Sequence, residues 1–258
     1  MTGLLSRLFY RATLGNQAYQ FLYRPGPPGE VVSLDCETTG LDPRRDDIVA
    51  VAAVLIRGNR ILTSQRFTAL VRPEDTQAGA ESIKIHRLRQ RDVADAQPMR
   101  RILPELLHFI GGRPLVGYYI DFDVRMLDKY VKDQLETKLP NPQIEVSALY
   151  YERKYGDAPP GSTFDLRFAN ILADLGIPPL EAHDALNDAI MAGMAYLALK
   201  DMKARKMRIA RERQTGALPP PPQPTPSEPL GRRAPCGPLP QCLPPCRRPS
   251  SRRPWMRP

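Results

Sequence analysis

The sequence predicts an α/β domain in which a mixed β-sheet is flanked by helices. Residues 31–71 contain three apolar or alternating segments joined by tight turns, a pattern typical of strands connected as hairpins. Beyond residue 98, segments whose apolar residues recur with a helical period alternate with short apolar runs. Hairpin-connected strands followed by alternating strands and helices are typical of a mixed sheet with helices packed against it.

Three strands are expected in the first part of this domain. Residues 31–37 are apolar and rich in β-branched residues, and they run into a Thr-Thr-Gly turn at residues 38–40. Residues 48–56 are apolar on both strand faces, which predicts a strand buried on both sides. A tight turn at residues 58–59 then leads into a third strand over residues 60–71.

The clearest helix is expected over residues 99–110. Apolar residues there follow a helical spacing, and Gly111 and Gly112 end the pattern. The remaining expected elements are a strand over residues 114–118, a helix over 122–135, a strand over 144–151, and helices over 164–175 and 184–213.

Both ends of the chain differ in composition from its centre. Residues 1–29 are expected to form a short amphipathic helix, over residues 1–11, and a Pro/Gly linker, so that the ordered domain begins near Glu30 and extends to residue 213. Fifteen of the 29 prolines lie in residues 215–258, together with seven Arg and one Glu. Because proline disrupts both helix and sheet, residues 214–258 are expected to be a disordered Pro/Arg-rich tail.

The composition argues against a membrane-spanning protein and against a disulfide-based core. The longest apolar run has nine residues, about half of the ~20 that a transmembrane helix needs. Three of the four cysteines lie in the tail and only Cys36 lies in the domain, which suits a reducing compartment. The amphipathic segment at the N-terminus lacks the features of a secretory signal peptide. We therefore expect a cytoplasmic protein that has no membrane partner.

Two acids mark the end of the first strand. Asp35 and Glu37 are two residues apart, so both carboxylates project from the same face, whereas Cys36 points to the other. Adjacent carboxylates repel each other and are costly to desolvate, and a hard cation such as Mg²⁺ would relieve that cost. The pair alone also fits an ordinary solvated strand end.

Three motifs in a fixed order accompany this pair. They are Asp35-x-Glu37 followed by Thr38-Thr39-Gly40-Leu41, then Phe122-Asp123, then His183-x-Ala185-x-x-Asp188. On these motifs, residues 31–200 resemble the DEDDh 3′→5′ exonucleases, the family that includes the proofreading epsilon subunit of bacterial DNA polymerase III, ribonuclease T and oligoribonuclease. A further segment ending in His86 resembles the family's Ile-His segment near the nucleotide pocket.

The resemblance implies an RNase-H-like fold and a two-metal hydrolysis of phosphodiester bonds. The implied ligands of two Mg²⁺ or Mn²⁺ ions are Asp35, Glu37, Asp123 and Asp188. The same four residues and His183 are the implied catalytic residues. His183 would accept the proton of the attacking water, for which an imidazole is suited near neutral pH. Outside the motif, His183 would be read as a hydrogen-bonded residue at a helix start.

The resemblance also implies residues that contact the substrate. They are Thr38, Thr39, Gly40, Leu41, His86, Tyr118, Tyr119 and Phe122. Tyr118 and Tyr119 stand where proofreading relatives usually carry His-Asn. The two rings either stack on a base or pack beneath the sheet edge with their hydroxyls bonded.

The function that these motifs imply is a metal-dependent 3′→5′ exonuclease acting on single-stranded or frayed DNA. Such an enzyme releases nucleoside 5′-monophosphates and acts alone or with DNA polymerase subunits as partners. RNA is the close alternative substrate. An inactive nucleic-acid-binding or polymerase-scaffold module is the alternative from another class, but such a module does not need four acids and His183 in one cleft.

Overall fold

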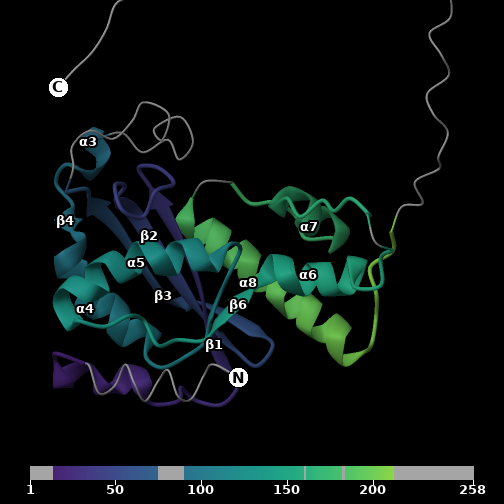
Figure 1. Cartoon of the computed structure of the whole chain (residues 1–258), viewed down its shortest axis with the longest axis horizontal. Coiled ribbons are helices and arrows are strands. Elements are labelled where there is room, and N and C mark those ends of the chain that lie inside the picture. The colour runs from purple at the N-terminus through teal and green to yellow at the C-terminus, as the bar shows by residue number, and fades with distance from the viewer. Residues whose placement is uncertain (1–13, 75–89, 160, 182–183, 212–258) are drawn as a thin grey trace, which may run out of the picture. The chain divides into compact units, whose positions relative to one another are not determined.

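Six strands form one mixed sheet in the order β4-β3-β2-β1-β5-β6. The structure is a computed structural model that describes residues 14–74, 90–159, 161–181 and 184–211. The chain divides into two units, Met1–Glu212 and Arg213–Pro258, and all described residues belong to the first unit. The described elements (Figure 1) are η1 (Gln17–Tyr23), β1 (Glu30–Thr38), β2 (Ile48–Arg57), β3 (Arg60–Arg72), α3 (Gln90–Val93), β4 (Gln97–Pro98), α4 (Met99–Ile110), β5 (Leu115–Gly117), α5 (Ile120–Leu135), β6 (Gln143–Glu145), α6 (Val146–Tyr155), α7 (Phe168–Asp174) and α8 (Ala185–Ala204).

The strand pairing confirms the predicted mixed sheet. β1, β2 and β3 form an antiparallel meander, in which residues 39–47 connect β1 to β2 and a tight turn at residues 58–59 connects β2 to β3. β5 pairs parallel to β1, and β6 pairs parallel to β5. β1 therefore lies inside the sheet, with β2 on one side and β5 on the other.

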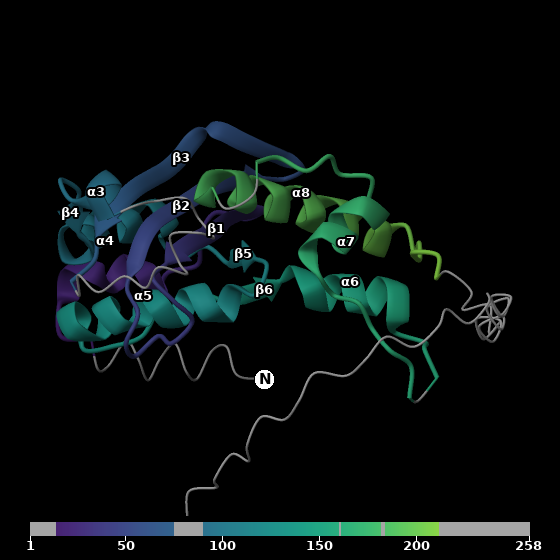
Figure 2. The same cartoon turned by 90° about the horizontal axis from the view of Figure 1, so that it is seen from above.

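Alternation along β1 sends its side chains into two separate apolar clusters. Val32 and Leu34 are fully buried against residues of α4 and α5. Val31, on the opposite face, packs with Val116 of β5 and with residues of α6, α7 and α8. Figure 2 shows α4 and α5 on one side of the strands and α8 on the other. The end of β1 thus lies between helices that approach from both faces.

Helix α4 has the predicted bounds. Its buried residues are Met99, Ile102, Leu103, Leu106, Leu107 and Ile110. Gly111, with a φ of 54°, follows the last turn and its N–H bonds to the carbonyl of Leu107. Glycine occupies this conformation without the steric cost that a side chain would add, so it ends the helix there.

Helix α8 crosses β1 and β2 at very close range. A Cβ at Gly193 would lie 3.0 Å from the Ile56 side chain and 3.5 Å from Ser33 Cβ. The missing side chain therefore lets the helix backbone approach the sheet. This approach brings the first turn of α8 to the end of β1, where the acids lie.

The strand expected over residues 144–151 is wrong for most of its length. Only residues Gln143–Glu145 pair with β5, and α6 begins at Val146. The Glu145 side chain accepts a hydrogen bond from the Ser147 N–H at 2.9 Å and so caps the helix. Val146, Ser147 and Tyr150 are buried at a helical spacing. Apolar and β-branched residues at the helix start resembled a strand in the sequence.

The last two helices are shorter than expected. α7 begins at Phe168 rather than at residue 164, because the Asp165 carboxylate accepts the Arg167 N–H at 3.1 Å and holds a turn ahead of the helix. α8 ends at Ala204 rather than at residue 213, and Lys206 has a left-handed φ of 56°. The chain beyond it runs along α6, where the Ile209 N–H bonds to the carbonyl of Arg153 at 3.2 Å.

Residues ahead of the expected domain start near Glu30 already pack against the domain. Leu14 and Leu22 are buried in the cluster that contains α4 and α5. The Gly15 N–H bonds to the Leu135 carbonyl at 3.1 Å, and the Gly26 N–H bonds to the Gly112 carbonyl at 3.2 Å. The helix expected in residues 1–11 and the tail over residues 214–258 lie outside the described residues.

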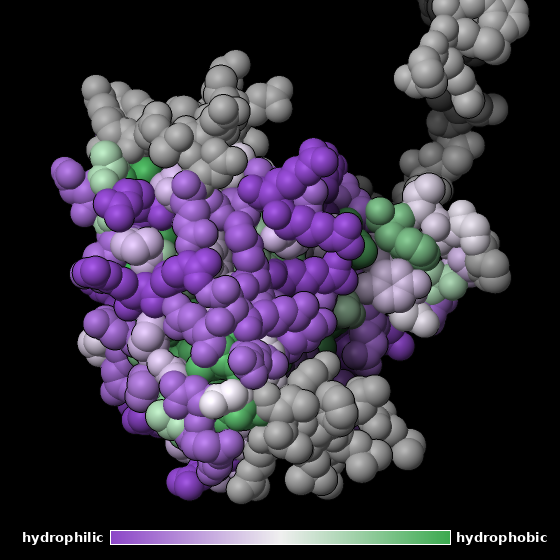
Figure 3. Space-filling model, turned by 60° about the vertical axis from the view of Figure 1, so that its left-hand side comes forward, coloured by the Kyte–Doolittle hydropathy of each residue, from purple (hydrophilic) through white to green (hydrophobic). Residues whose placement is uncertain are grey.

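No helix in the described ranges is long and apolar enough to cross a membrane. Most of the surface seen in Figure 3 is hydrophilic, with small apolar areas between polar side chains. This distribution fits amphipathic helices that present their polar sides to water.

An ion-pair triad fixes the start of β1. The Glu30 carboxylate is buried and accepts hydrogen bonds from Arg57 Nε and Arg113 Nε, each at 2.7 Å. Burial by itself raises the pKa of Glu30, but the hydrogen bonds from Arg113 and Arg57 outweigh it and lower the pKa below its ordinary value. The triad joins β1, β2 and the turn after α4.

We predict that Glu30→Gln lowers the free energy of unfolding at neutral pH by roughly 1–3 kcal/mol, because two guanidinium groups lose their charged acceptor. The pKa of Glu30 is lowered in the folded protein, so the stabilisation is present above pH 4.5 and is lost as the pH falls through the lower folded value. Urea unfolding of both proteins at neutral pH and below pH 4.5 tests this. A difference that stays constant with pH would contradict it.

Candidate active site

Three carboxylates converge at the end of β1. Ligand oxygens of Asp35, Glu37 and Asp188 all lie within 4.8 Å of one another. Asp35 and Glu37 come from alternate positions of β1, as predicted, and Asp188 comes from the first turn of α8. The structure thus brings together residues that are 150 positions apart in the chain.

A fourth predicted acid, Asp123, lies beside this group. It sits in the first turn of α5 and is buried. Its Oδ1 atom accepts a hydrogen bond at 3.0 Å from the backbone N–H of Cys36, the residue between Asp35 and Glu37. This bond fixes α5 to the strand that carries the other two acids.

The acids shift one another's pKa values, because water cannot fully screen their charges. Burial, followed by the charges of Asp123 and Asp188, raises the pKa of Asp35 well above its usual range. Burial, followed by the charges of Asp188 and Asp184, raises the pKa of Glu37 to about 7. The cluster therefore holds more negative charge than its surroundings stabilise, which favours protons or cations at this place.

The start of α8 is defined by Asp184. Its side chain accepts the Asn187 N–H at 3.0 Å, which caps the helix and places Asp188 one turn inside it. His183, the predicted base, immediately precedes Asp184 and lies outside the described residues. His86 also lies outside them.

The Thr-Thr-Gly turn after β1 uses its hydroxyl groups internally. Thr38 Oγ1 donates to the Gly40 carbonyl at 2.7 Å, and Thr39 Oγ1 accepts the Asp47 N–H at 2.9 Å. A Cβ at Gly40 would lie 2.5 Å from the Asp46 carboxylate, so a larger residue there would displace the Asp46 side chain. Leu41 follows this turn with 85% of its surface exposed.

Tyr118 and Tyr119 have different environments. The Tyr118 hydroxyl donates to the Leu166 carbonyl at 3.0 Å, and its ring stacks on Phe168 with centroids 4.7 Å apart. Tyr119 is exposed and adopts a left-handed φ of 57° ahead of α5. Phe122 packs against the cluster beneath α4 and α5. Tyr118 thus has the bonded hydroxyl that the packing alternative required, whereas the Tyr119 ring remains accessible.

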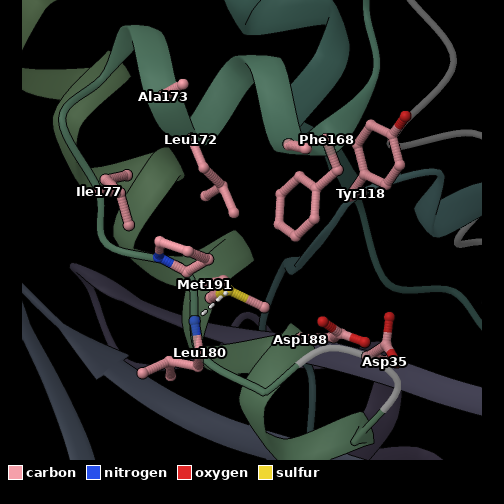
Figure 4. A pocket seen from close by; sticks show the side chains of 11 residues that line it. Asp35, Tyr118, Phe168, Leu172, Ala173, Ile177, Leu180, Asp188 and Met191 are labelled. Atoms are coloured by element: carbon pink, nitrogen blue, oxygen red, sulfur yellow. Dashed lines mark hydrogen bonds between the residues drawn. The ribbon is translucent and has the colours of Figure 1, made fainter.

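A cavity of about 450 Å³ opens next to the acids. Figure 4 shows the carboxylates of Asp35 and Asp188 at one end and the rings of Tyr118 and Phe168 above the cavity. Its lining residues are Asp35, Tyr118, Phe168, Ala169, Leu172, Ala173, Ile177, Pro179, Leu180, Asp188 and Met191. The wall is therefore mainly apolar, with negative charge concentrated at one end.

Asp47 is a buried acid that the sequence reasoning did not identify. Asp47 accepts hydrogen bonds from Tyr130 Oη at 3.0 Å and from the Glu74 N–H at 2.7 Å, and it forms an ion pair with Lys129. These contacts join the start of β2 to α5. A single Asp before an apolar run gives no signal in the sequence, because its partners lie in distant segments.

Residues 32–196, more than half of the chain, match the RNase_T family model, described as an exonuclease. The chain belongs to this exonuclease family. The resemblance drawn from the motifs is thereby confirmed, and the protein is a nuclease by family. The catalytic and binding roles of individual residues stay predictions.

Curated relatives of this exonuclease domain are DNA polymerase III proteins. The DNA polymerase III PolC-type protein of Thermotoga maritima is 30% identical over 174 residues, which cover 66% of this chain and 12% of that protein. The DNA polymerase III subunit epsilon of Aquifex aeolicus is 28% identical over 172 residues, which cover 66% of this chain and 80% of that subunit. The chain therefore spans only 12% of the length of the PolC-type relative.

Solved structures confirm the RNase-H-like exonuclease fold. Exonuclease X in complex with 5′ overhanging duplex DNA aligns with a TM-score of 0.53 and 22% identity, over 67% of this chain and 93% of that chain. The E. coli exonuclease I–ssDNA complex, in its zinc-bound form, aligns with a TM-score of 0.58 and 15% identity, over 69% of this chain and 42% of that chain.

We predict that the exonuclease domain in excess chelator loses stability as the pH rises from about 4.5 to about 7. In that interval the folded protein keeps a proton on Glu37 that the unfolded chain has already released, so higher pH favours unfolding. Added Mg²⁺ or Mn²⁺ should reverse the loss at pH 7, because a cation binds the charged form. Urea unfolding followed by circular dichroism measures both effects.

The matched control is Glu37→Gln, which cannot titrate. It should show a flatter pH profile in chelator than the natural sequence. An unchanged profile would mean that other groups cause the pH dependence.

Proposed function

We propose that this protein is a metal-dependent 3′→5′ exonuclease that acts on single-stranded or frayed DNA and releases nucleoside 5′-monophosphates. The observation that carries the proposal is the convergence of the Asp35, Glu37 and Asp188 carboxylates within 4.8 Å, in a chain of the exonuclease family. Asp123 supplies a fourth carboxylate next to them. Phosphodiester hydrolysis at such a cluster requires a cation, since the substrate is itself anionic.

The donor set fits hard divalent cations. All described candidate ligands are carboxylates, and Mg²⁺ and Mn²⁺ prefer oxygen ligands. The raised pKa values of Asp35 and Glu37 have burial and neighbouring negative charges as their causes. We propose that Asp35, Glu37, Asp123 and Asp188 hold two such ions. When bound, the ions would neutralise charge on the attacking and departing oxygens.

In the proposed reaction, His183 acts on the water molecule that hydrolyses the terminal phosphodiester. The oxygen of a water molecule attacks the phosphorus of the terminal phosphodiester, and the bond from phosphorus to the O3′ of the preceding nucleotide breaks. His183 accepts the proton of that water, and the departing O3′ takes up a proton from solvent to become the new 3′ hydroxyl. The released nucleotide keeps its phosphate on the 5′ position.

The names of the relatives support DNA as the substrate. The similar replication proteins are subunits or forms of DNA polymerase III, and the solved neighbours include complexes with duplex and single-stranded DNA. We propose that association with polymerase subunits, as a proofreading activity, is the setting of this exonuclease. RNA is the alternative substrate that the experiment below distinguishes.

Substrate contacts are proposed for residues around the carboxylates. Leu41 and Tyr119 offer exposed side chains, and the Thr38–Gly40 turn shapes the loop that carries Leu41. Phe122 and His86 complete the proposed set.

We also propose that the cavity beside Asp35 receives a nucleobase close to the scissile bond. Its wall is apolar and aromatic, which suits the face of a base, and its acidic end lies where a phosphate would meet the bound cations. Because the Tyr118 hydroxyl already donates to the Leu166 carbonyl, the wall offers few hydrogen-bonding groups that could recognise the edge of a base. Binding there would depend on an unpaired strand and little on base identity.

The full chain is expected to shorten 5′-labelled single strands stepwise from the 3′ end only in the presence of Mg²⁺ or Mn²⁺. Matched DNA and RNA oligomers identify the substrate. Asp188→Asn should abolish digestion because the cluster loses a carboxylate. His183→Ala should lower the rate by about 10²–10⁴-fold while binding of the oligomer persists.

Three outcomes would contradict parts of this proposal. Undiminished digestion in excess chelator would exclude the metal mechanism. Near-normal turnover of His183→Ala would make His183 a structural residue. Oligomer binding without cleavage under any metal condition would favour the inactive nucleic-acid-binding module.

The cavity proposal predicts that Ala169→Trp raises KM for short oligomers. Ala169 lines the cavity from an exposed position of α7, so the larger side chain fills it with little effect on folding. Loss of one base contact worth ~1–3 kcal/mol corresponds to roughly a five- to hundredfold change. Ala204→Trp, at the exposed end of α8, is the matched control.

An oligomer with an abasic site at the last or the preceding position should show the same KM increase with the natural sequence. It should show no further increase with Ala169→Trp. Additive increases would place the base outside this cavity.

A further inference from the structure

We propose that Glu145 is a positioning residue for Asp123, acting through the first turn of α5. This inference rests on the proposed function, because it assigns Asp123 to the metal-binding carboxylates. Glu145 is the last residue of β6 and belongs to none of the three exonuclease motifs. Neither its place in the sequence nor the family motifs single it out.

The Glu145 carboxylate binds the starts of two helices at once. Oε1 accepts the Ser147 N–H of α6 at 2.9 Å and the Tyr119 N–H at 3.1 Å. Oε2 accepts the Ile120 N–H at 3.0 Å. Since the first N–H groups of a helix have no partner within the helix, this one side chain satisfies donors of both α5 and α6.

Helix α5 depends on this contact because it lacks a cap of its own. Tyr119, its N-cap residue, makes no side-chain cap hydrogen bond. Tyr119 also has a φ of 57°, an unfavourable backbone conformation for a bulky residue. Such a conformation persists only when neighbouring contacts hold it, and the hydrogen bonds from Tyr119 and Ile120 to Glu145 are contacts of this kind.

The strand pairing puts Glu145 in reach of that turn. Gly117, the last residue of β5, pairs with Glu145 in the parallel register, and only Tyr118 separates Gly117 from Tyr119. A glutamate side chain is long enough to extend from β6 to the start of α5. The length of this side chain therefore links the end of the sheet to the helix that carries Asp123.

The position of Asp123 follows from the start of α5. Asp123 is three residues beyond Ile120, within the first turn, and its Oδ1 accepts the Cys36 N–H at 3.0 Å. If Glu145 releases Tyr119 and Ile120, the left-handed residue can relax and the first turn can rotate. Asp123 would then move relative to Asp35 and Glu37, which are fixed on β1.

Glu145 acts from outside the acidic cluster itself. Both of its oxygens accept backbone N–H bonds, and Oε1 also accepts the Ser147 hydroxyl at 2.8 Å. It is not among the three acids that converge within 4.8 Å. Residues that orient metal ligands without contacting the metal typically change metal affinity or activity by about 10–100-fold when replaced.

The experiment compares Glu145→Ala with Asp128→Ala in the full chain. Asp128 lies on the same helix, and its Oδ1 accepts the Leu139 N–H at 2.8 Å at a place remote from the first turn. Both variants remove a carboxylate that bonds to backbone, so they control for general destabilisation. Glu145→Gln keeps one acceptor oxygen and serves as the milder variant if Glu145→Ala does not fold.

Three quantities are measured at a temperature well below each Tm. They are Mn²⁺ binding by electron paramagnetic resonance, kcat with saturating oligomer, and KM for the oligomer. Glu145→Ala should weaken Mn²⁺ binding and lower kcat by about 10–100-fold with KM nearly unchanged, and Glu145→Gln should lie between it and the natural sequence. Asp128→Ala should keep all three within about twofold.

Equal effects of Glu145→Ala and Asp128→Ala on Mn²⁺ binding would overturn the proposal and leave Glu145 as an ordinary helix cap. Because Mn²⁺ binding is measured without turnover, this result is distinct from failure of the proposed function. If the natural chain binds Mn²⁺ but cleaves no oligomer, the proposed exonuclease activity is overturned. The Mn²⁺ affinities of the variants then still test the role of Glu145.

Discussion

The mutual repulsion of carboxylates at the end of β1 is the constraint on which the rest of this structure depends. Asp35, Glu37 and Asp188 meet within 4.8 Å, with Asp123 bonded to the strand between the first two. Like charges at such distances, partly removed from water, raise the free energy of the folded state. Neighbouring negative charges contribute to the raised pKa of Asp35 and of Glu37. The remainder of the fold must hold these groups together despite their repulsion. A bound cation would offset much of this unfavourable free energy.

Elements from both faces of the sheet provide the necessary rigidity. On one face, Gly193 lets α8 lie close to β1 and β2, so that Asp188 reaches the end of β1. On the other face, Asp47 joins β2 to Lys129 and Tyr130 of α5. Gly193 lies five residues beyond Asp188 on α8, and Lys129 lies six residues beyond Asp123 on α5, so these contacts fix the helices that carry the acids. A site on packed strands and helices is held more precisely than one on loops.

Much of the fold could be predicted because its elements carry strong local patterns. The apolar spacing of residues 99–110 and the glycine after it define α4, and the nine-residue apolar run defines β2. Predictions failed where a polar contact overrode the pattern. Residues 146–151 look like a strand by composition, but the Glu145 cap and the burial of Tyr150 against other helices make them helical. The N-terminal Leu14 and Leu22 gave no periodic signal, and only the core beneath α4 and α5 explains their burial.

The sequence by itself determined the family and predicted which acids lie at the site, since ordered motifs record the residue types that members of a family share. Alternation along one strand also predicted that Asp35 and Glu37 lie together, because neighbouring residues have fixed relative directions. The tertiary structure alone decided that Asp188 approaches them, that Asp123 bonds to Cys36, and that Asp47 and Glu145 hold α5 in place. The physical reason is that these contacts join residues 25–153 positions apart, and their geometry depends on how the helices pack on the sheet, which no local pattern encodes.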